Sequence, residues 1–234
     1  MSYLTEKSAI PKKVIFPYNC ADFILSESAM EIVCLDLEGV LVPEIWIAFA
    51  EKTGIPELKA TTRDYSDYDE LMQMRLGVLD KHNLGLNDIN EVISNIAPLA
   101  GAKAFLDKIR DEYQLVILSD TFYEFGMPLM RQLGLPTLFC HRLETDANGR
   151  IINYKLRLTD HKRKAVEAFK QLNFNIVAAG DSYNDTTMLK AADTGILFRA
   201  PQNVIEEFPQ YQSAVEYDDL YNKIVAGFTA AGNG

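Results

Sequence analysis

Residues 31–40 read EIVCLDLEGV, and this stretch decides the fold that we predict. Its first part, Ile32 to Leu35, is a short continuous apolar run, which is typical of a buried strand. The run ends in two acids two residues apart, Asp36 and Glu38, and then in Gly39, where the chain can turn away. In a doubly wound sheet, ligands bind at the carboxyl ends of the strands, so this stretch predicts a functional site after the first strand.

Short apolar strands alternate with helical stretches along the rest of the chain. This alternation predicts an α/β protein with a doubly wound, mostly parallel sheet of the Rossmann-like type. An Asn148-Gly149 pair, which favours the positive backbone angles of a tight turn, adds a hairpin. The expected strands are 115–118, 137–144, 151–157, 176–179 and 195–198, and the expected helices are 103–113, 125–133, 161–172 and 218–228.

About eighty residues separate the first strand from the second, which is too long for an ordinary connection. Residues 44–52, 68–80 and 87–96 carry apolar side chains at helical spacing, and Pro98 closes the run. We therefore expect a helical cap domain at 43–98, inserted into a core domain formed by 30–42 and 99–234. Residues 1–29 are expected to be an extension outside the core, and Met30 is a candidate start of translation.

The composition narrows the class of partner. The 234 residues carry a formal net charge of -10, which argues against nucleic-acid and anionic-membrane surfaces and leaves small metals and metabolites open. Three widely spaced cysteines, Cys20, Cys34 and Cys140, form no CxxC pair and indicate reduced thiols. With neither a membrane-spanning run nor a secretory signal in the sequence, we predict a cytoplasmic protein.

Further polar groups follow the later strands. The second strand runs into Ser119-Asp120-Thr121, whose hydroxyls and backbone amides suit phosphate oxygens, and another strand runs into GDSYND at 180–185. Each group alone is common as a turn or helix cap. Four groups in order, each at a strand end or a helix start, together supply a nucleophile, an acid, an anion holder and metal-binding acids. We therefore interpret them as one site.

The helix start contributes a lysine, and Lys162 and Lys164 compete for this role. Lys162 lies four residues before Val166 and seven before Phe169, so it is expected on the face of the helix that meets the sheet. Lys164 is two residues before Val166 and points away, so we choose Lys162.

These motifs are DLEG at 36–39, LSDT at 118–121, the helical Lys162 and GDSYND at 180–185. With them the chain resembles the haloacid dehalogenase superfamily, in particular its phosphoserine phosphatase branch and the bifunctional phosphoserine phosphatase and homoserine phosphotransferase proteins. The resemblance covers about residues 30 to 230.

The resemblance implies a mechanism. Asp36 would attack phosphorus to give an aspartyl phosphate, and Glu38 would act as the general acid and base. Mg²⁺ would be held by the carboxylates of Asp36 and Asp181 and by the backbone carbonyl of Glu38. The phosphate-binding residues would be Ser119, Asp120, Lys162 and Asn184, with Asp185 supporting the site from behind.

The resemblance also implies a substrate, phosphoserine. Glu44, just after the first motif, would pair with its ammonium group, and Arg75 on a cap helix would bind its carboxylate. A plainer interpretation is that Glu44 favours the start of its helix and Arg75 is a solvated helical residue. The oligomeric state stays open.

Three departures from the wider branch match the bifunctional subgroup. Glu38 replaces an aspartate, Val40 stands where a hydroxyl residue is common, and Asp120-Thr121 replaces a pair of glycines. The division of the phosphoryl group between water and homoserine stays open.

Other functions compete with this interpretation. One is a phosphatase for another small phosphorylated metabolite. A second is a phosphoacceptor signalling module, but such modules are shorter and place the acceptor on a later strand. A dehalogenase would not need acids arranged for a cation, and the intact acid set argues against a silent binding protein.

Overall fold

The sheet is built as the alternation predicts. The computed structural model describes residues 29–61, 64–65 and 67–231, so the extension expected at 1–29 lies outside the described residues except for its last one. The described strands form one seven-stranded sheet in the order β4-β3-β2-β1-β5-β6-β7, in which β3 and β4 are antiparallel and the other neighbours parallel. Their bounds are β1 Met30–Leu35, β2 Gln114–Phe122, β3 Thr137–Thr145, β4 Ile151–Lys155, β5 Phe174–Gly180, β6 Thr194–Phe198 and β7 Gln212–Ala214.

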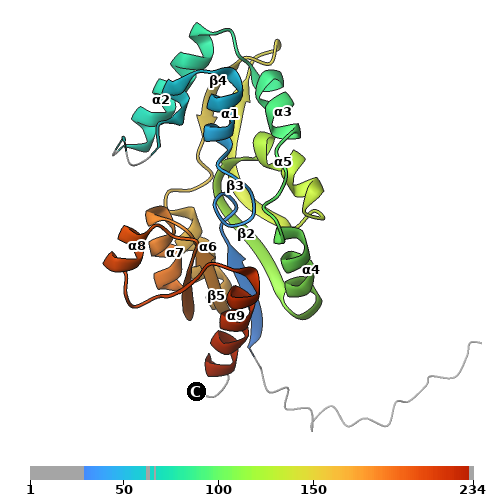
Figure 1. Cartoon of the computed structure of the whole chain (residues 1–234), viewed down its shortest axis with the longest axis vertical. Helices are drawn as coiled ribbons and strands as arrows, with labels where there is room; N and C mark the ends of the chain where they lie inside the picture. Colours follow the sequence, from blue (N-terminus) through green and yellow to red (C-terminus); the bar gives the residue numbers. More distant parts are fainter. Residues whose placement is uncertain (1–28, 62–63, 66, 232–234) are drawn as a thin grey trace, which may run out of the picture.

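Both faces of the sheet are covered by helices. In β1, Val33 and Leu35 belong to one apolar cluster and Ile32 and Cys34 to another, because successive side chains of a strand point to opposite faces. The first cluster contains α4 Ala102–Glu112, α5 Tyr123–Gln132 and α9 Tyr217–Ala231, and the second contains α6 His161–Gln171, α7 Thr186–Ala191 and α8 Gln202–Glu207. The predicted doubly wound α/β class is therefore confirmed (Figure 1).

The described part of the connection from β1 towards α4 contains four helices. It contains α1 Ile45–Thr53, the 3-10 helix η1 Pro56–Lys59, α2 Tyr68–Lys81 and α3 Leu86–Ser94. We call α1, α2 and α3 the cap helices. They gather at one end of the molecule, beyond the core helices, and β4 reaches up beside them (Figure 1). The division into domains at residues 43 and 98 stays a prediction.

One local expectation was wrong. β2 does not end at Leu118 but continues to Phe122, because the extended backbone resumes its pairing with β3 at Phe122 and His141 after a register shift. The expected hairpin forms, and its turn lies at 146–149, where the N–H of Gly149 donates to the carbonyl of Asp146 at 3.1 Å. Within the Asn148-Gly149 pair only Gly149 has a positive φ, 81°. Among the described residues, no helix is long and apolar enough to cross a membrane.

Candidate active site

The centre of the site is a buried ion pair between Asp36 and Lys162. Asp36 follows β1, and its N–H donates to the carbonyl of Ala179 in the neighbouring β5, 3.0 Å away, which fixes the backbone at this edge. Lys162 lies in the first turn of α6, and its Nζ is 2.9 Å from Asp36 Oδ1. Both side chains are buried, so little solvent screens the pair.

Two further acids come from the segment after β5. Carboxylate oxygens of Asp36, Asp181 and Asp185 all lie within 4.8 Å of one another. Asp185 Oδ1 accepts Lys162 Nζ at 2.8 Å, and its Oδ2 accepts the backbone N–H groups of Asp181 and Ser182 at 3.0 and 3.1 Å. Asp185 therefore binds both Lys162 and the backbone of the loop that follows β5. The carboxylate of Asp181 lies in the acid cluster with Asp36 and Asp185.

Gly39 is needed for this arrangement. Its φ is 75°, a conformation that favours glycine, and a Cβ at this position would overlap the carboxylate of Asp181. The turn after β1 therefore passes directly against Asp181.

The electrostatics of the cluster reflect this crowding of acids. Burial and the neighbouring Asp185 raise the pKa of Asp36, while Lys162 opposes the rise. Burial, together with Asp185 and Glu44, raises the pKa of Asp181 to about 7. Burial alone would lower the pKa of Lys162, but Asp120, Asp185 and Asp36 hold it well above its usual value, so the ammonium stays charged.

Asp120, in the irregular part of β2, joins this centre to other groups. Its Oδ2 accepts Asn184 Nδ2 at 2.8 Å and lies 3.1 Å from Lys162 Nζ. Burial would raise the pKa of Asp120, but the charge of Lys162 and contacts from His141 and His161 hold it well below its usual range. Asp120 is therefore an anion at neutral pH, and its carboxylate oxygens accept hydrogen bonds from Asn184 and His161.

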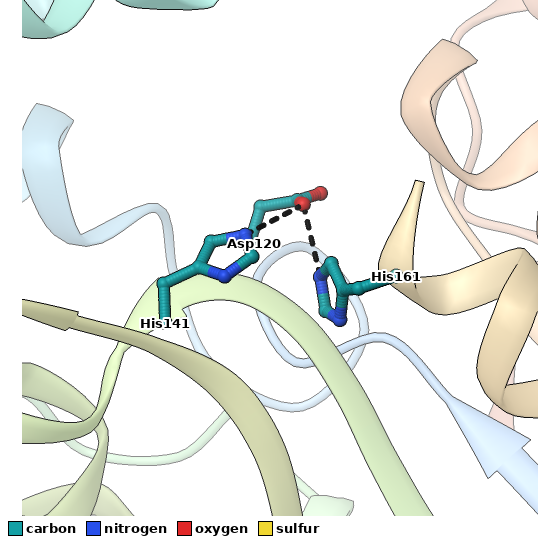
Figure 2. Close-up of side chains that lie close together, drawn as sticks. All are labelled: Asp120, His141 and His161. Carbon is teal, nitrogen blue, oxygen red and sulfur yellow. Dashed lines mark hydrogen bonds and ion pairs between the residues drawn. The ribbon is translucent and has the colours of Figure 1, made fainter. Parts of the chain in front are cut away.

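The sequence prediction missed His141 and His161. Both imidazoles point at the same carboxylate oxygen of Asp120 (Figure 2). The sequence offered one indication for His161, because this residue directly precedes Lys162 at the helix start. His141 is near Asp120 because β3 lies beside β2 in the sheet.

Glu38 faces the cap helices. Its Oε1 accepts the N–H of Ile45, the first residue of α1, at 2.7 Å. Burial and the nearby Glu44 raise the pKa of Glu38 to about 8, although Arg75 and Lys162 oppose this. The charges of both Lys162 and Arg75 thus act on Glu38.

Arg75 is buried in the cap and is not the solvated helical residue of the plainer interpretation. It donates from Nη2 to the carbonyl of Ala60 at 2.9 Å, and its guanidinium lies 4.5 Å from the centre of the Trp46 ring. Its Nε–H is buried and has no hydrogen-bond partner among the described residues. Burial lowers the pKa of Arg75 to about 10, so the group is still a cation at neutral pH.

The remaining predicted residues divide between the two sides. Ser119 is buried in β2, and its Oγ accepts the N–H of Thr121 at 3.2 Å, a local contact. Asn184 is more exposed and binds Asp120. Glu44 is exposed at the N-cap of α1, on the cap side with Arg75. The structure brings six of the predicted residues together at the carboxyl ends of the central strands: Asp36, Asp120, Lys162, Asp181, Asn184 and Asp185.

In a mostly parallel sheet of this kind, ligands bind at the carboxyl ends of the strands, and here buried acids and a lysine gather at those ends, the arrangement of an α/β protein with an acidic ligand site. The model of the haloacid dehalogenase-like hydrolases matches residues 30–193, and the chain belongs to this family. The family predicted from the motifs is thereby confirmed.

Two relatives agree with this assignment, and a solved structure agrees with the fold. The chain is 62% identical to a phosphoserine phosphatase of Pseudomonas syringae pv. tomato, over 86% of this chain and 85% of the relative. It is 64% identical to phosphoserine phosphatase ThrH of Pseudomonas aeruginosa, over 82% of this chain and 93% of the relative. A solved phospho-aspartyl intermediate analogue of phosphoserine phosphatase has a similar fold, with a TM-score of 0.66 and 21% identity over 81% of this chain and 94% of that one.

Proposed function

We propose that this protein is a magnesium-dependent phosphoserine phosphatase that works through an aspartyl phosphate on Asp36. The observation that carries the proposal is the buried pair of Asp36 and Lys162 within a cluster of acids. A carboxylate nucleophile beside a fixed cation is suited to attack on a phosphate, whose developing charge the cation neutralises. The two Pseudomonas relatives, both named phosphoserine phosphatase, support the choice of substrate.

The donor set suits Mg²⁺. Mg²⁺ prefers oxygen ligands, and the carboxylates of Asp36 and Asp181 with the backbone carbonyl of Glu38 would hold it. Asp185 is already engaged by Lys162 and two N–H groups, so it would orient the site from behind. Once bound, the ion supplies the positive charge that offsets repulsion between the attacking carboxylate and the phosphate.

The chemistry takes two steps. An oxygen of Asp36 forms a bond to phosphorus while the bond from phosphorus to the serine oxygen breaks, and the Glu38 carboxyl gives that oxygen its proton. In the second step Glu38 takes a proton from water, the water oxygen attacks phosphorus, and the bond to Asp36 breaks to release phosphate. Lys162, Ser119 and Asn184 would bind the phosphoryl oxygens in both steps.

Arg75 and Glu44 would select the amino acid. The Nε–H of the buried Arg75 guanidinium has no hydrogen-bond partner in the described part of the chain, and an unpaired buried donor favours a ligand that can accept from it. The substrate carboxylate is such an acceptor, and an arginine fork binds carboxylates in two-pronged fashion. Glu44, on the same side, would pair with the ammonium group.

We further propose that homoserine can replace water in the second step. Its hydroxyl oxygen would attack phosphorus, Glu38 would take the hydroxyl proton, and the bond from phosphorus to Asp36 would break to release phosphohomoserine. The longer Glu38 in place of aspartate shifts the proton-transferring oxygen, and catalysis is sensitive to shifts on the order of 1 Å.

The deciding experiment incubates the protein with phosphoserine and Mg²⁺, with and without homoserine, and measures free phosphate and phosphohomoserine. Magnesium-dependent phosphate release from phosphoserine is expected, and phosphohomoserine is expected only when homoserine is present. No phosphate release under any condition would refute the phosphatase. Equal rates on unrelated phosphorylated metabolites would indicate the broader phosphatase instead.

We also propose that the protein is cytoplasmic. This proposal is supported by Cys34 and Cys140, which are free, buried thiols and therefore suit a reducing compartment.

A further inference from the structure

Two buried histidines lie beside the site and have no role in the chemistry proposed above. His141 is on β3 and His161 begins α6, and they are 3% and 2% exposed. Their ring centres are 4.5 Å apart. Each directs its Nε2 at Oδ1 of Asp120, from 3.1 Å for His161 and from 3.7 Å, beyond hydrogen-bond distance, for His141 (Figure 2).

Arg157 determines where the imidazole protons lie. Its backbone N–H donates to Nδ1 of His141 at 3.1 Å, and its guanidinium Nη2 is 3.1 Å from Nδ1 of His161. Arginine and backbone nitrogen are donors only, so both Nδ1 atoms must accept. Each histidine is therefore neutral and carries its proton on Nε2, which faces Asp120.

Asp120 links the histidines to Lys162 and Asn184, two of the residues that would bind the phosphoryl group. Its Oδ1 accepts Nε2–H of His161 at 3.1 Å and faces Nε2 of His141 at 3.7 Å, while its Oδ2 accepts Asn184 Nδ2 at 2.8 Å and lies 3.1 Å from Lys162 Nζ. One carboxylate thus connects two rigid buried rings to two of the donors that would bind the phosphoryl group.

A metal ion is the competing explanation of this cluster. Ligand atoms of Asp120, His141 and His161 lie within 4.8 Å of one another, and histidine with carboxylate is a common zinc donor set. A histidine that binds a metal through Nε2 normally donates its Nδ1–H to an acceptor. Here both Nδ1 atoms face donors of Arg157, so the surroundings oppose ligation.

We propose that His141 and His161, with their tautomers set by Arg157, are positioning residues that fix Asp120 and through it Lys162 and Asn184. This inference rests on the proposed function, because it needs Lys162 and Asn184 to bind the phosphoryl group. It replaces the phosphate contact predicted for Asp120 with a supporting role, since an anionic carboxylate repels phosphate.

The first test measures the tautomers in the wild-type protein and needs no variant. Two-bond ¹H–¹⁵N correlation spectra at neutral pH distinguish protonation at Nδ1 from protonation at Nε2. Both buried histidines are expected in the Nε2–H form, with no loss of those protons when Zn²⁺ is added. A proton on Nδ1 in either ring, or replacement of Nε2–H by zinc, would overturn the inference.

The second test is kinetic. His161→Phe keeps a ring and removes the donor, whereas His161→Gln keeps an N–H that can reach Asp120. We expect His161→Phe to lower kcat for phosphoserine about tenfold to a hundredfold with little change in KM, and His161→Gln to recover most of the loss. His82→Phe, at the exposed C-cap of α2, is the matched control and should behave as wild type.

The outcomes separate the two proposals. An active wild type with an equally active His161→Phe variant would overturn the positioning role alone. A wild type that releases no phosphate from phosphoserine would overturn the proposed function and the positioning role with it.

Discussion

At the scale of the residue, Asp36 and Lys162 form a buried ion pair at the centre of the site. Asp36→Asn removes the nucleophilic charge but keeps the shape of the side chain. We expect no phosphoenzyme after acid quenching with ³²P-phosphoserine, and a fall in rate of at least about a thousandfold. Asp107→Asn, an exposed acid on α4, should leave both quantities unchanged. A normal rate in Asp36→Asn would remove Asp36 from the nucleophilic role.

Arg75 offers a test of substrate selection. Arg75→Ala should raise KM for phosphoserine by about tenfold or more, since a charge-assisted bond to the substrate carboxylate is lost, and should change KM for an aryl phosphate far less. Arg131→Ala, at an exposed site near the end of α5, controls for the loss of positive charge. Equal effects on both substrates would contradict carboxylate binding by Arg75.

The lowered pKa of His161 leads us to expect that the stability of the protein depends on pH. Burial lowers the pKa of His161 below its ordinary value of 6.5, so at lower pH the unfolded chain takes up a proton that the folded protein refuses. The wild type should therefore lose stability relative to His161→Gln as the pH falls below about 6.5, with a constant difference above it. Urea unfolding of both proteins between pH 8 and pH 5.5 measures this difference, and a relative gain at low pH would contradict the assigned neutral state.

At the scale of the element, a glycine can be required by a positive φ, by a lack of space for a Cβ, or by both. Three glycines of this chain differ in these two requirements. Gly39 has a positive φ and no room for a Cβ beside Asp181, Gly54 has a positive φ in open space, and Gly77 in α2 has neither restriction. We expect Gly77→Ala to stabilise the protein by about 0.5–1 kcal/mol and Gly54→Ala to destabilise it by about 1–2 kcal/mol. Gly39→Ala should destabilise the protein as well, and of the three variants it is the one expected to abolish activity, because the added Cβ would displace the carboxylate of Asp181. Urea unfolding and phosphate release measure the two effects, and an active Gly39→Ala variant would show that Asp181 tolerates displacement.

Much of the sheet could be predicted from the sequence, because each strand carries its own local signal. β1, β5 and β6 contain short apolar runs, and the spacing of Lys162 to Val166 places that lysine on the buried side of α6. The continuation of β2 to Phe122 could not be predicted, since it depends on pairing with β3 across the register shift.

The group formed by Asp120, His141 and His161 could not be predicted for a related reason. Its members come from three elements, and only the order of the strands brings them together. A single histidine in a strand or a helix start has no periodic pattern that indicates its neighbour. The roles of the predicted site residues and the boundaries of the cap stay predictions.

At the scale of the whole molecule, binding of a metal to the folded state alone should stabilise the fold. Mg²⁺ at about a hundred times its dissociation constant should raise the free energy of unfolding by about 2–3 kcal/mol. The gain should be much smaller in Asp181→Asn and should persist in Asp107→Asn. Urea unfolding with Mg²⁺ and with EDTA measures it, and an equal gain in all three proteins would place the ion elsewhere.

The hairpin of β3 and β4 has a consequence for how the cap helices can move. Its loop accepts the N–H of Leu86 at the Gly149 carbonyl, 2.9 Å away, and Arg150 and Tyr154 bind Asp80 and Asp69 of α2. These contacts add to the attachments made where the chain enters and leaves the cap helices. Any movement of the cap helices relative to the sheet therefore has to break the contacts that the hairpin makes with α2 and with the start of α3.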